Sequence, residues 1–151
     1  MSADTFVDTH VLVYVRDASE PRKQKQAKAW MHFLWQTGTG RLSFQVLQEF
    51  YVTVTEKLSP GLTAARARED VQSLFVWKPI PVDPMVMETA WHIQSRFKIS
   101  WWDSLIVSAA LQAGCRYLLT EDLQEGQDFG DLHVLSPFNR SPADVFSEPE
   151  A

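Results

Sequence analysis

Four acidic residues in this sequence lie at positions from which they could act together on a ligand. Asp8 and Asp122 each follow a short, apolar, β-prone stretch, whereas Glu49 and Asp103 fall in stretches with helical periodicity. Two carboxylates about 5 Å apart repel each other by roughly 3 kcal/mol at an effective dielectric constant of ~20. Four of them in one cleft would therefore either take up protons or bind a hard cation.

The chemistry of such a cluster follows from its donor atoms. Oxygen ligands without cysteine suit Mg²⁺ or Mn²⁺ better than Zn²⁺, and the only cysteine is Cys115. A hard cation held by carboxylates is typical of phosphodiester hydrolysis, because it activates water and stabilises the leaving oxygen. Each acid also has a purely structural interpretation, as a helix cap, a turn former or an exposed helix residue. In particular, Asp103 stands at the capping-box distance from Ser100.

The elements that must position these acids alternate between strand and helix. Apolar stretches predict strands at 5–7, 42–44, 80–82, 117–119 and 133–135. Helical periodicity begins near Val11 and predicts helices at 21–35, 45–58, 63–75, 84–97 and 102–113. This order favours an α/β domain with a mainly parallel sheet, in which ligands bind beyond the carboxyl ends of the strands. We expect one domain over 1–138, followed by a loose polar tail over 139–151.

Length and composition narrow the protein class further. The 151 residues are 45% hydrophobic and 22% charged, which is typical of a globular domain. No apolar run approaches the ~20 residues of a membrane helix, and no secretory signal is recognisable at the N-terminus. A single cysteine excludes an internal disulfide and favours a cytoplasmic protein. The net charge of −5 argues against a broad surface that wraps a nucleic-acid duplex.

Four stretches of the sequence resemble, in order, the motifs of PIN-domain proteins of the kind found as VapC-type toxins in bacterial and archaeal toxin–antitoxin pairs. These stretches are Phe6–Tyr14, Ser43–Tyr51, Trp102–Ile106 and Leu118–Gly126. The resemblance implies a three-layer α/β/α sandwich with a mainly parallel central sheet. It also implies a Mg²⁺- or Mn²⁺-dependent endoribonuclease that leaves a 5′-phosphate and a 3′-hydroxyl. The implied partners are an RNA substrate, a cognate antitoxin and a second copy in a homodimer.

Carried over residue by residue, the resemblance implies four catalytic, metal-binding acids: Asp8, Glu49, Asp103 and Asp122. Two neighbours, Glu121 and Asp128, are alternatives for the fourth position. We prefer Asp122 because Thr120-x-Asp122 matches the family pattern. Thr120 is then expected to reach a phosphate or a ligand water.

The sequence departs from the family at His10, where an Asn or Ser is usual. We expect His10 to hydrogen-bond the first acid or to add a nitrogen ligand that favours Mn²⁺, unless it is merely tolerated at the helix start. Arg96 and Lys98 are candidates for RNA contact because they come shortly before the loop at Ser100. Trp101 is a further candidate, since an indole can stack on a base, although it could instead cover the apolar core.

An alternative to the nuclease is a PIN module that has lost its activity and acts only through protein or RNA interaction. The presence of all four acids favours the enzyme. Two other acidic α/β proteins fit less well. An aspartyl-nucleophile phosphatase needs a second Asp where His10 stands, and the paired acids and lysine of a phospho-receiver are missing.

Overall fold

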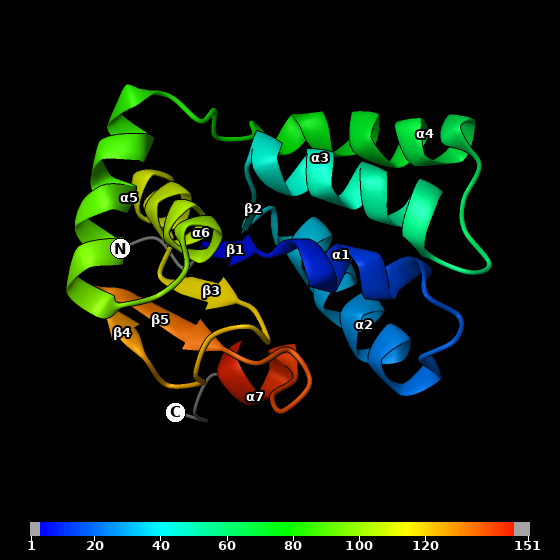
Figure 1. Ribbon diagram of the computed structural model, residues 1–151. Coiled ribbons are helices and arrows are strands. Elements are labelled where there is room, and N and C mark those ends of the chain that lie inside the picture. Colours follow the sequence, from blue (N-terminus) through cyan, green and yellow to red (C-terminus); the bar gives the residue numbers. More distant parts are fainter. Residues whose placement is uncertain (1–3, 147–151) are drawn as a thin grey trace.

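The computed structural model describes residues 4–146, which form five strands and seven α-helices. The strands make one sheet in the order β2-β1-β3-β5-β4 (Figure 1). All neighbouring pairs are parallel except β4 and β5, which form an antiparallel hairpin at one edge. The strands are β1 (Thr5–Val7), β2 (Gly40–Arg41), β3 (Tyr117–Leu119), β4 (Asp128–Phe129) and β5 (Leu132–Leu135).

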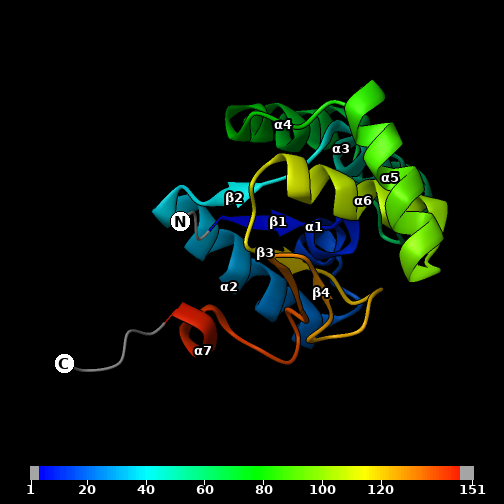
Figure 2. The same ribbon diagram turned by 90° about the vertical axis from the view of Figure 1, so that its left-hand side faces the viewer.

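Helices cover both faces of this sheet. In Figure 2, α6 lies above the strands with α5 outside it, while α2 and α7 lie below. The expected three-layer α/β/α sandwich with a mainly parallel sheet is therefore confirmed. The α-helices are α1 (Thr9–Arg16), α2 (Pro21–Thr37), α3 (Phe44–Val52), α4 (Ala64–Leu74), α5 (Pro84–Phe97), α6 (Trp101–Gln112) and α7 (Pro142–Phe146).

The central strands are apolar on both faces because helices cover both sides of a parallel sheet. Phe6 and Val7 of β1, like Leu118 and Leu119 of β3, are fully buried. In the parallel register of these two strands, Val7 lies opposite Leu119. The next residue of each strand therefore leaves the sheet at the same carboxyl edge.

Two predicted strands are shorter or displaced in the structure. The stretch at 42–44 is not a strand: β2 ends at Arg41, and Ser43 caps α3 by accepting a hydrogen bond from the Val46 amide. The stretch at 80–82 is reduced to one parallel bridge between Ser43 and Ile80. The prolines on both sides of Ile80 lack the amide hydrogen that a longer ladder needs.

The helix predicted at 45–58 also changes form before its end. The α-helical part stops at Val52, and Thr53–Lys57 continues as a π-helix. In this segment the Thr55 hydroxyl donates a hydrogen bond to the Tyr51 carbonyl, a contact that competes with regular helical bonding. The short strand β4 was not expected, because its two residues are too few to produce a recognisable alternation.

The C-terminal segment differs from the loose tail expected over 139–151. Residues 142–146 form α7, and the Phe146 ring stacks on Phe33 at 5.0 Å and meets Tyr117 edge-on at 5.5 Å. The Trp30 indole also donates a hydrogen bond to the Arg140 carbonyl. The polar composition of this segment concealed the anchor, which rests on the apolar side chains of Val145 and Phe146. Residues 147–151 lie outside the described part of the chain.

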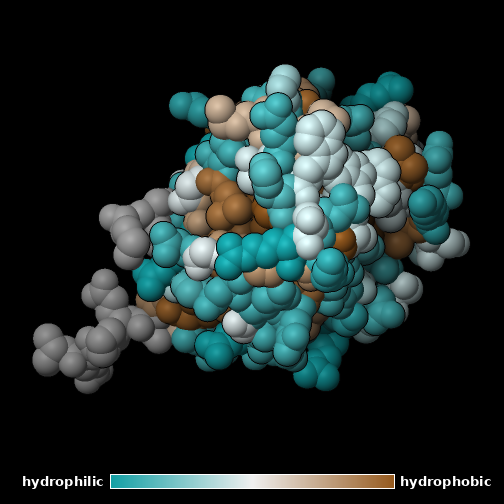
Figure 3. Space-filling view, turned by 60° about the vertical axis from the view of Figure 1, so that its left-hand side comes forward, coloured by the Kyte–Doolittle hydropathy of each residue, from teal (hydrophilic) through white to brown (hydrophobic). Residues whose placement is uncertain are grey.

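The outer side of α5 exposes several large apolar side chains. Trp91 is 55% exposed there, and Met85 and Met87 are exposed on the same helix. Figure 3, which brings this side forward, shows ring-shaped side chains of intermediate hydropathy and brown apolar ones within the teal surface. Within residues 4–146, no helix combines the length and apolar character that crossing a membrane requires.

We predict that Phe146→Ala lowers the free energy of unfolding by about 1–2 kcal/mol, because it removes a half-buried ring from an aromatic cluster. Urea denaturation followed by circular dichroism measures this change. Phe75→Ala is the matched control, since Phe75 is 48% exposed. Equal stability of the Phe146 variant and the native protein would contradict the packing described for α7.

Candidate active site

Asp8 is a buried carboxylate at the carboxyl end of β1. Its side chain is only 6% exposed and caps α1, with one oxygen accepting a 2.7 Å hydrogen bond from the Thr9 amide. The other oxygen accepts a 2.7 Å hydrogen bond from the Thr120 hydroxyl. Burial raises the Asp8 pKa from 3.8 to about 6, although both hydrogen bonds oppose this shift. The negative charge of Asp122 adds to the increase.

Thr120 joins the ends of the two central strands. It follows β3 as Asp8 follows β1, so the parallel register brings the two residues side by side. Its hydroxyl donates to Asp8 and accepts a 3.0 Å hydrogen bond from the Asp122 amide. In the structure the Thr120 hydroxyl thus links the Asp8 carboxylate to the backbone of Asp122, which fixes these two acids relative to each other.

Asp122 lies at the exposed side of this network, next to His10. The distance from His10 Nδ1 to Asp122 Oδ2 is 3.2 Å, and both side chains are substantially exposed. Of the alternatives considered for His10, the structure shows a hydrogen bond, but it is made to Asp122 and not to the first acid, Asp8. His10 is the second residue of α1, directly after buried Thr9, and its exposed side chain reaches Asp122.

The two alternatives for the fourth acid have other partners. Glu121 accepts hydrogen bonds from the Tyr14 hydroxyl at 2.8 Å and from Lys23 at 2.9 Å. Asp128 lies on β4 and pairs with His133 on β5. The geometry therefore favours Asp122 over both as the neighbour of Asp8.

Glu49 and Asp103 reach the same region from two helices. Asp103 lies in the first turn of α6, where the Ser100 side chain caps the helix by accepting a 3.0 Å hydrogen bond from the Asp103 amide. A helix N-terminus favours negative charge. Glu49 lies on α3, four residues after Gln45, and is exposed as periodicity predicted. Desolvation of the carboxyl group is the largest cause that raises the pKa of both acids.

The four carboxyl groups lie close enough to affect one another's pKa. The negative charge of Asp122 raises the pKa of each of the other three acids, and positive charge on His10 lowers it. Asp103 also raises the pKa of Glu49. Like charges held in one cleft create a local demand for a cation.

The donor set of this cleft fits a hard divalent cation, although its members do not converge fully. It offers carboxylate oxygens from four residues, and oxygen ligands are those that Mg²⁺ and Mn²⁺ prefer. Among residues 4–146, no three His, Cys, Asp or Glu side chains lie close enough together, as they stand, to hold a metal ion. The four carboxylates therefore influence one another electrostatically, but some of their side chains would have to move before they could bind one cation together.

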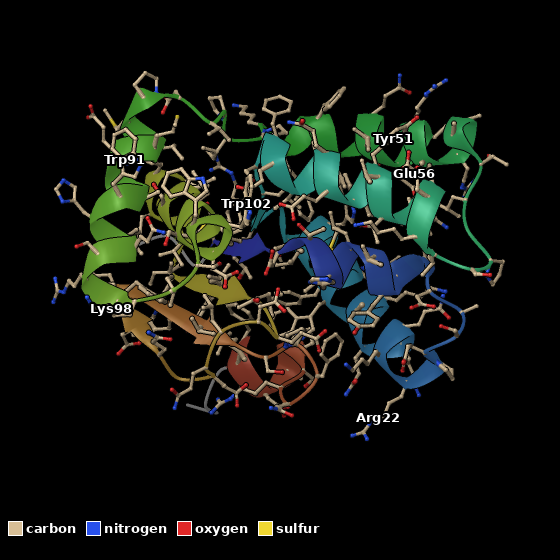
Figure 4. The ribbon with its side chains drawn as sticks, in the orientation of Figure 1. Arg22, Tyr51, Glu56, Trp91, Lys98 and Trp102 are labelled. Atoms are coloured by element: carbon tan, nitrogen blue, oxygen red, sulfur yellow. The ribbon has the colours of Figure 1, made fainter. Side chains whose placement is uncertain are left out.

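The candidates for RNA contact differ in how accessible the structure leaves them. Trp101 is half-buried and stacks on Trp91 at 6.2 Å, whereas Trp102 is 65% exposed and lies between α6 and α3 (Figure 4). Lys98 lies at the end of α5, on the side of the molecule that carries β4 (Figure 4). Arg96 is exposed on the last turn of α5, with its guanidinium 5.2 Å from the Phe97 ring. The exposed indole of this pair is thus Trp102.

One residue of the site was missed in the sequence. Gln45 is buried on α3, and its amide nitrogen has no hydrogen-bond partner in the structure. The amide nevertheless lies close enough to the Glu49 carboxylate, one helical turn away, to lower its pKa by side-chain hydrogen bonding, although that contact lacks good hydrogen-bond geometry. The available signal was the i, i+4 spacing, which puts these two side chains on the same helix face.

Comparison with known proteins shows the family to which this chain is related. A model of the PIN domain matches residues 5–125, a range that includes all four acids. The chain belongs to the PIN domain family. No curated protein sequence matches it significantly.

The PIN assignment agrees with a solved structure. VapC20 of Mycobacterium tuberculosis, described as a Sarcin-Ricin loop cleaving toxin, is similar to this PIN domain with a TM-score of 0.59. The likeness covers 79% of this chain and 90% of that one, at 19% sequence identity. At this level of identity, the comparison concerns the fold.

We predict that Asp8→Asn stabilises the metal-free PIN domain at pH 7.5. Folding raises the pKa of Asp8 from 3.8 to about 6, so the native state binds the proton more tightly than the unfolded state does. The free energy of unfolding therefore falls as pH rises through this window, by at most about 3 kcal/mol. Removing the charge recovers part of that loss, about 1–2 kcal/mol, because an amide cannot repeat both hydrogen bonds.

Urea denaturation in chelator at pH 7.5 and pH 4 measures this effect. The stabilisation should disappear at pH 4, where Asp8 is protonated in the native protein. Asp131→Asn, at an exposed acid, is the control and should change stability little at either pH. A destabilised Asp8→Asn protein at pH 7.5 would contradict the unfavourable effect of burying this charged carboxylate.

Proposed function

We propose that this PIN domain is a metal-dependent endoribonuclease that acts as the toxin of a toxin–antitoxin pair. The observation that carries the proposal is the arrangement at the carboxyl edge of the sheet, where the Thr120 hydroxyl donates to Asp8 and accepts from the Asp122 amide. Glu49 and Asp103 are close enough for the charge of Asp122 to raise their pKa. Membership of the PIN family and the VapC-like fold support the same function. The cation is Mg²⁺ or Mn²⁺, and the enzyme works in the cytoplasm as a homodimer that a cognate antitoxin inhibits.

The proposed mechanism divides the work among the four acids. When bound, the cation activates water and neutralises charge on the phosphate. Asp8 contributes the most rigid oxygens, because the Thr9 amide and Thr120 hydroxyl hold its orientation. A carboxylate has about four lone-pair sites, so capacity for the cation remains on Asp8 after these two bonds.

The other acids act on the more exposed side of the cleft. Either Glu49 or Asp103 orients the attacking water and accepts its proton, a role favoured by the raised pKa of both groups. His10 donates to Asp122 and thereby orients it.

We predict that the purified protein cuts RNA at discrete positions when Mn²⁺ or Mg²⁺ is present and does not cut in chelator. Asp103→Asn should cleave at least about 100-fold more slowly, because it loses a charged ligand or base. Total cellular RNA is incubated with each protein, and the new 5′ ends are sequenced. The antitoxin must first be removed by denaturation and refolding.

Identically prepared Asp103→Asn protein controls for contaminating nucleases. Cuts made equally by both proteins, or cuts that persist in chelator, would contradict the proposal. An inactive native protein that still binds RNA would instead favour the alternative, a PIN module that acts only through binding.

We predict that Thr120→Val lowers cleavage activity by about 10–100-fold, the usual effect of removing a hydrogen-bond partner of a metal ligand. Valine keeps the shape of threonine but neither donates to Asp8 nor accepts from the Asp122 amide. The Mn²⁺ concentration required for half-maximal activity should rise. The Mn²⁺-induced increase in Tm should shrink, which tests metal binding independently of activity.

Thr120→Ser is the matched control because it retains the hydroxyl group, and it should stay close to native activity. If Thr120→Val kept both its activity and its Mn²⁺ response, the hydrogen bonds of Thr120 would have no part in positioning the acids.

A further inference from the structure

A cavity of about 440 Å³ opens directly beside the acidic cleft, between α3 and α6. It is lined by Gln45, Gln48, Glu49, Val82, Trp102 and Leu105. Its size lies within the range of about 300–1,000 Å³ that is usual for small-ligand pockets. Because Glu49 belongs to both the cavity and the acidic cleft, a ligand in this cavity would lie next to any phosphate held by the acids.

Gln45 gives the cavity a polar group whose bonding is incomplete. The residue is only 8% exposed, and its amide nitrogen has no hydrogen-bond partner. A buried donor without a well-formed hydrogen bond costs free energy. Within residues 4–146 the Glu49 carboxylate is close enough for the Gln45 amide to lower its pKa, but the amide nitrogen makes no hydrogen bond of good geometry. The terminal torsion of glutamine is broad, so the amide can turn towards a ligand in the cavity.

Trp102 gives the cavity a flat apolar wall. Its indole is 65% exposed, although its neighbour Trp101 is stacked and half-buried. Within residues 4–146, no ring contact involves Trp102. An exposed indole beside amide groups matches a flat heterocycle, which stacks on the ring and forms hydrogen bonds through its edge.

The charge of the cavity lining favours a nucleobase over a phosphate as the bound group. Its lining contains one acid, Glu49, and no lysine or arginine. A phosphate there would be repelled, whereas a neutral nucleobase would not. Val82 and Leu105 supply apolar contact area for such a ring.

We propose that this cavity binds the nucleobase adjacent to the cleaved phosphate, stacked on Trp102 and recognised by the Gln45 amide. The amide nitrogen donates to an acceptor on the base edge, a carbonyl oxygen or an unprotonated ring nitrogen. Gln45 and Trp102 thereby determine which bases flank the cut. This inference rests on the proposed ribonuclease function and names the part of its substrate that the cavity recognises.

Binding of four fluorescein-labelled RNA octamers, one for each base, tests the proposal by fluorescence anisotropy. All proteins carry Asp103→Asn and are measured with Mg²⁺, so that the RNA stays intact. The parent should prefer one base by about tenfold, and Gln45→Met should reduce this preference to about twofold or less. Trp102→Ala should weaken binding of the preferred octamer by at least about fivefold, and Trp102→Phe by less.

Trp91→Ala is the matched control, because Trp91 is an exposed tryptophan outside the cavity. It should bind all four octamers as the parent does. Trp102 is exposed, so its variants should fold even if Gln45→Met does not. Unchanged base preference in Gln45→Met, or unchanged affinity in both Trp102 variants, would overturn the proposal and favour a protein side chain as the occupant.

The same variants without Asp103→Asn separate this inference from the proposed function. Altered bases at the cut sites would support base recognition in this cavity. Metal-dependent cleavage at unchanged positions and rates would overturn base recognition alone. If no protein cleaves RNA, the nuclease function fails, whereas the anisotropy series still decides whether the cavity binds a base.

Discussion

The burial of one carboxylate at the end of the central strand constrains the rest of this structure. A charged group removed from water must be compensated by hydrogen bonds or by an opposite charge. For Asp8 the compensation comes from the Thr9 amide and the Thr120 hydroxyl. The second of these bonds is available only because β1 and β3 pair in parallel with Val7 opposite Leu119. Shifting this register by one residue would leave the carboxylate without the hydroxyl.

A helix cap and a hydrogen-bonded turn position two of the other acids relative to Asp8. Asp103 occupies the first turn of a capped helix, and Asp122 follows a turn closed by the Thr120 hydroxyl. Capping and catalysis are therefore not competing explanations at these positions. A cap fixes a carboxylate at the start of a helix, where backbone amides already favour negative charge. The same placement holds the acids at the edge of the sheet, where the proposed metal would bind.

Much of this arrangement could be predicted from the sequence because it depends on local signals. The apolar runs that form β1 and β3 identified the sheet, and the acids that follow them identified its functional edge. Weak or short signals gave the wrong elements: the prolines beside Ile80 left only a bridge, and α7 is anchored by rings within a polar segment. The contact between His10 and Asp122 was not predicted, since it depends on how closely a loop 112 residues away approaches α1. Long-range distances of this kind have no periodicity in the sequence.

The two tryptophans before Asp103 have different surroundings, although they are neighbours on the same helix. Trp101 packs against α5 with Trp91 and helps to close a small apolar cluster around Val86. The next residue on a helix points about 100° away, so Trp102 cannot join that cluster and faces α3 instead. The capped start of α6 therefore places three side chains at once: one half-buried indole, one exposed indole and the Asp103 carboxylate. Because all three belong to a single helical turn, the backbone positions of the exposed indole and the acid are fixed relative to each other, as the proposed stacking of a base beside the cleaved phosphate requires.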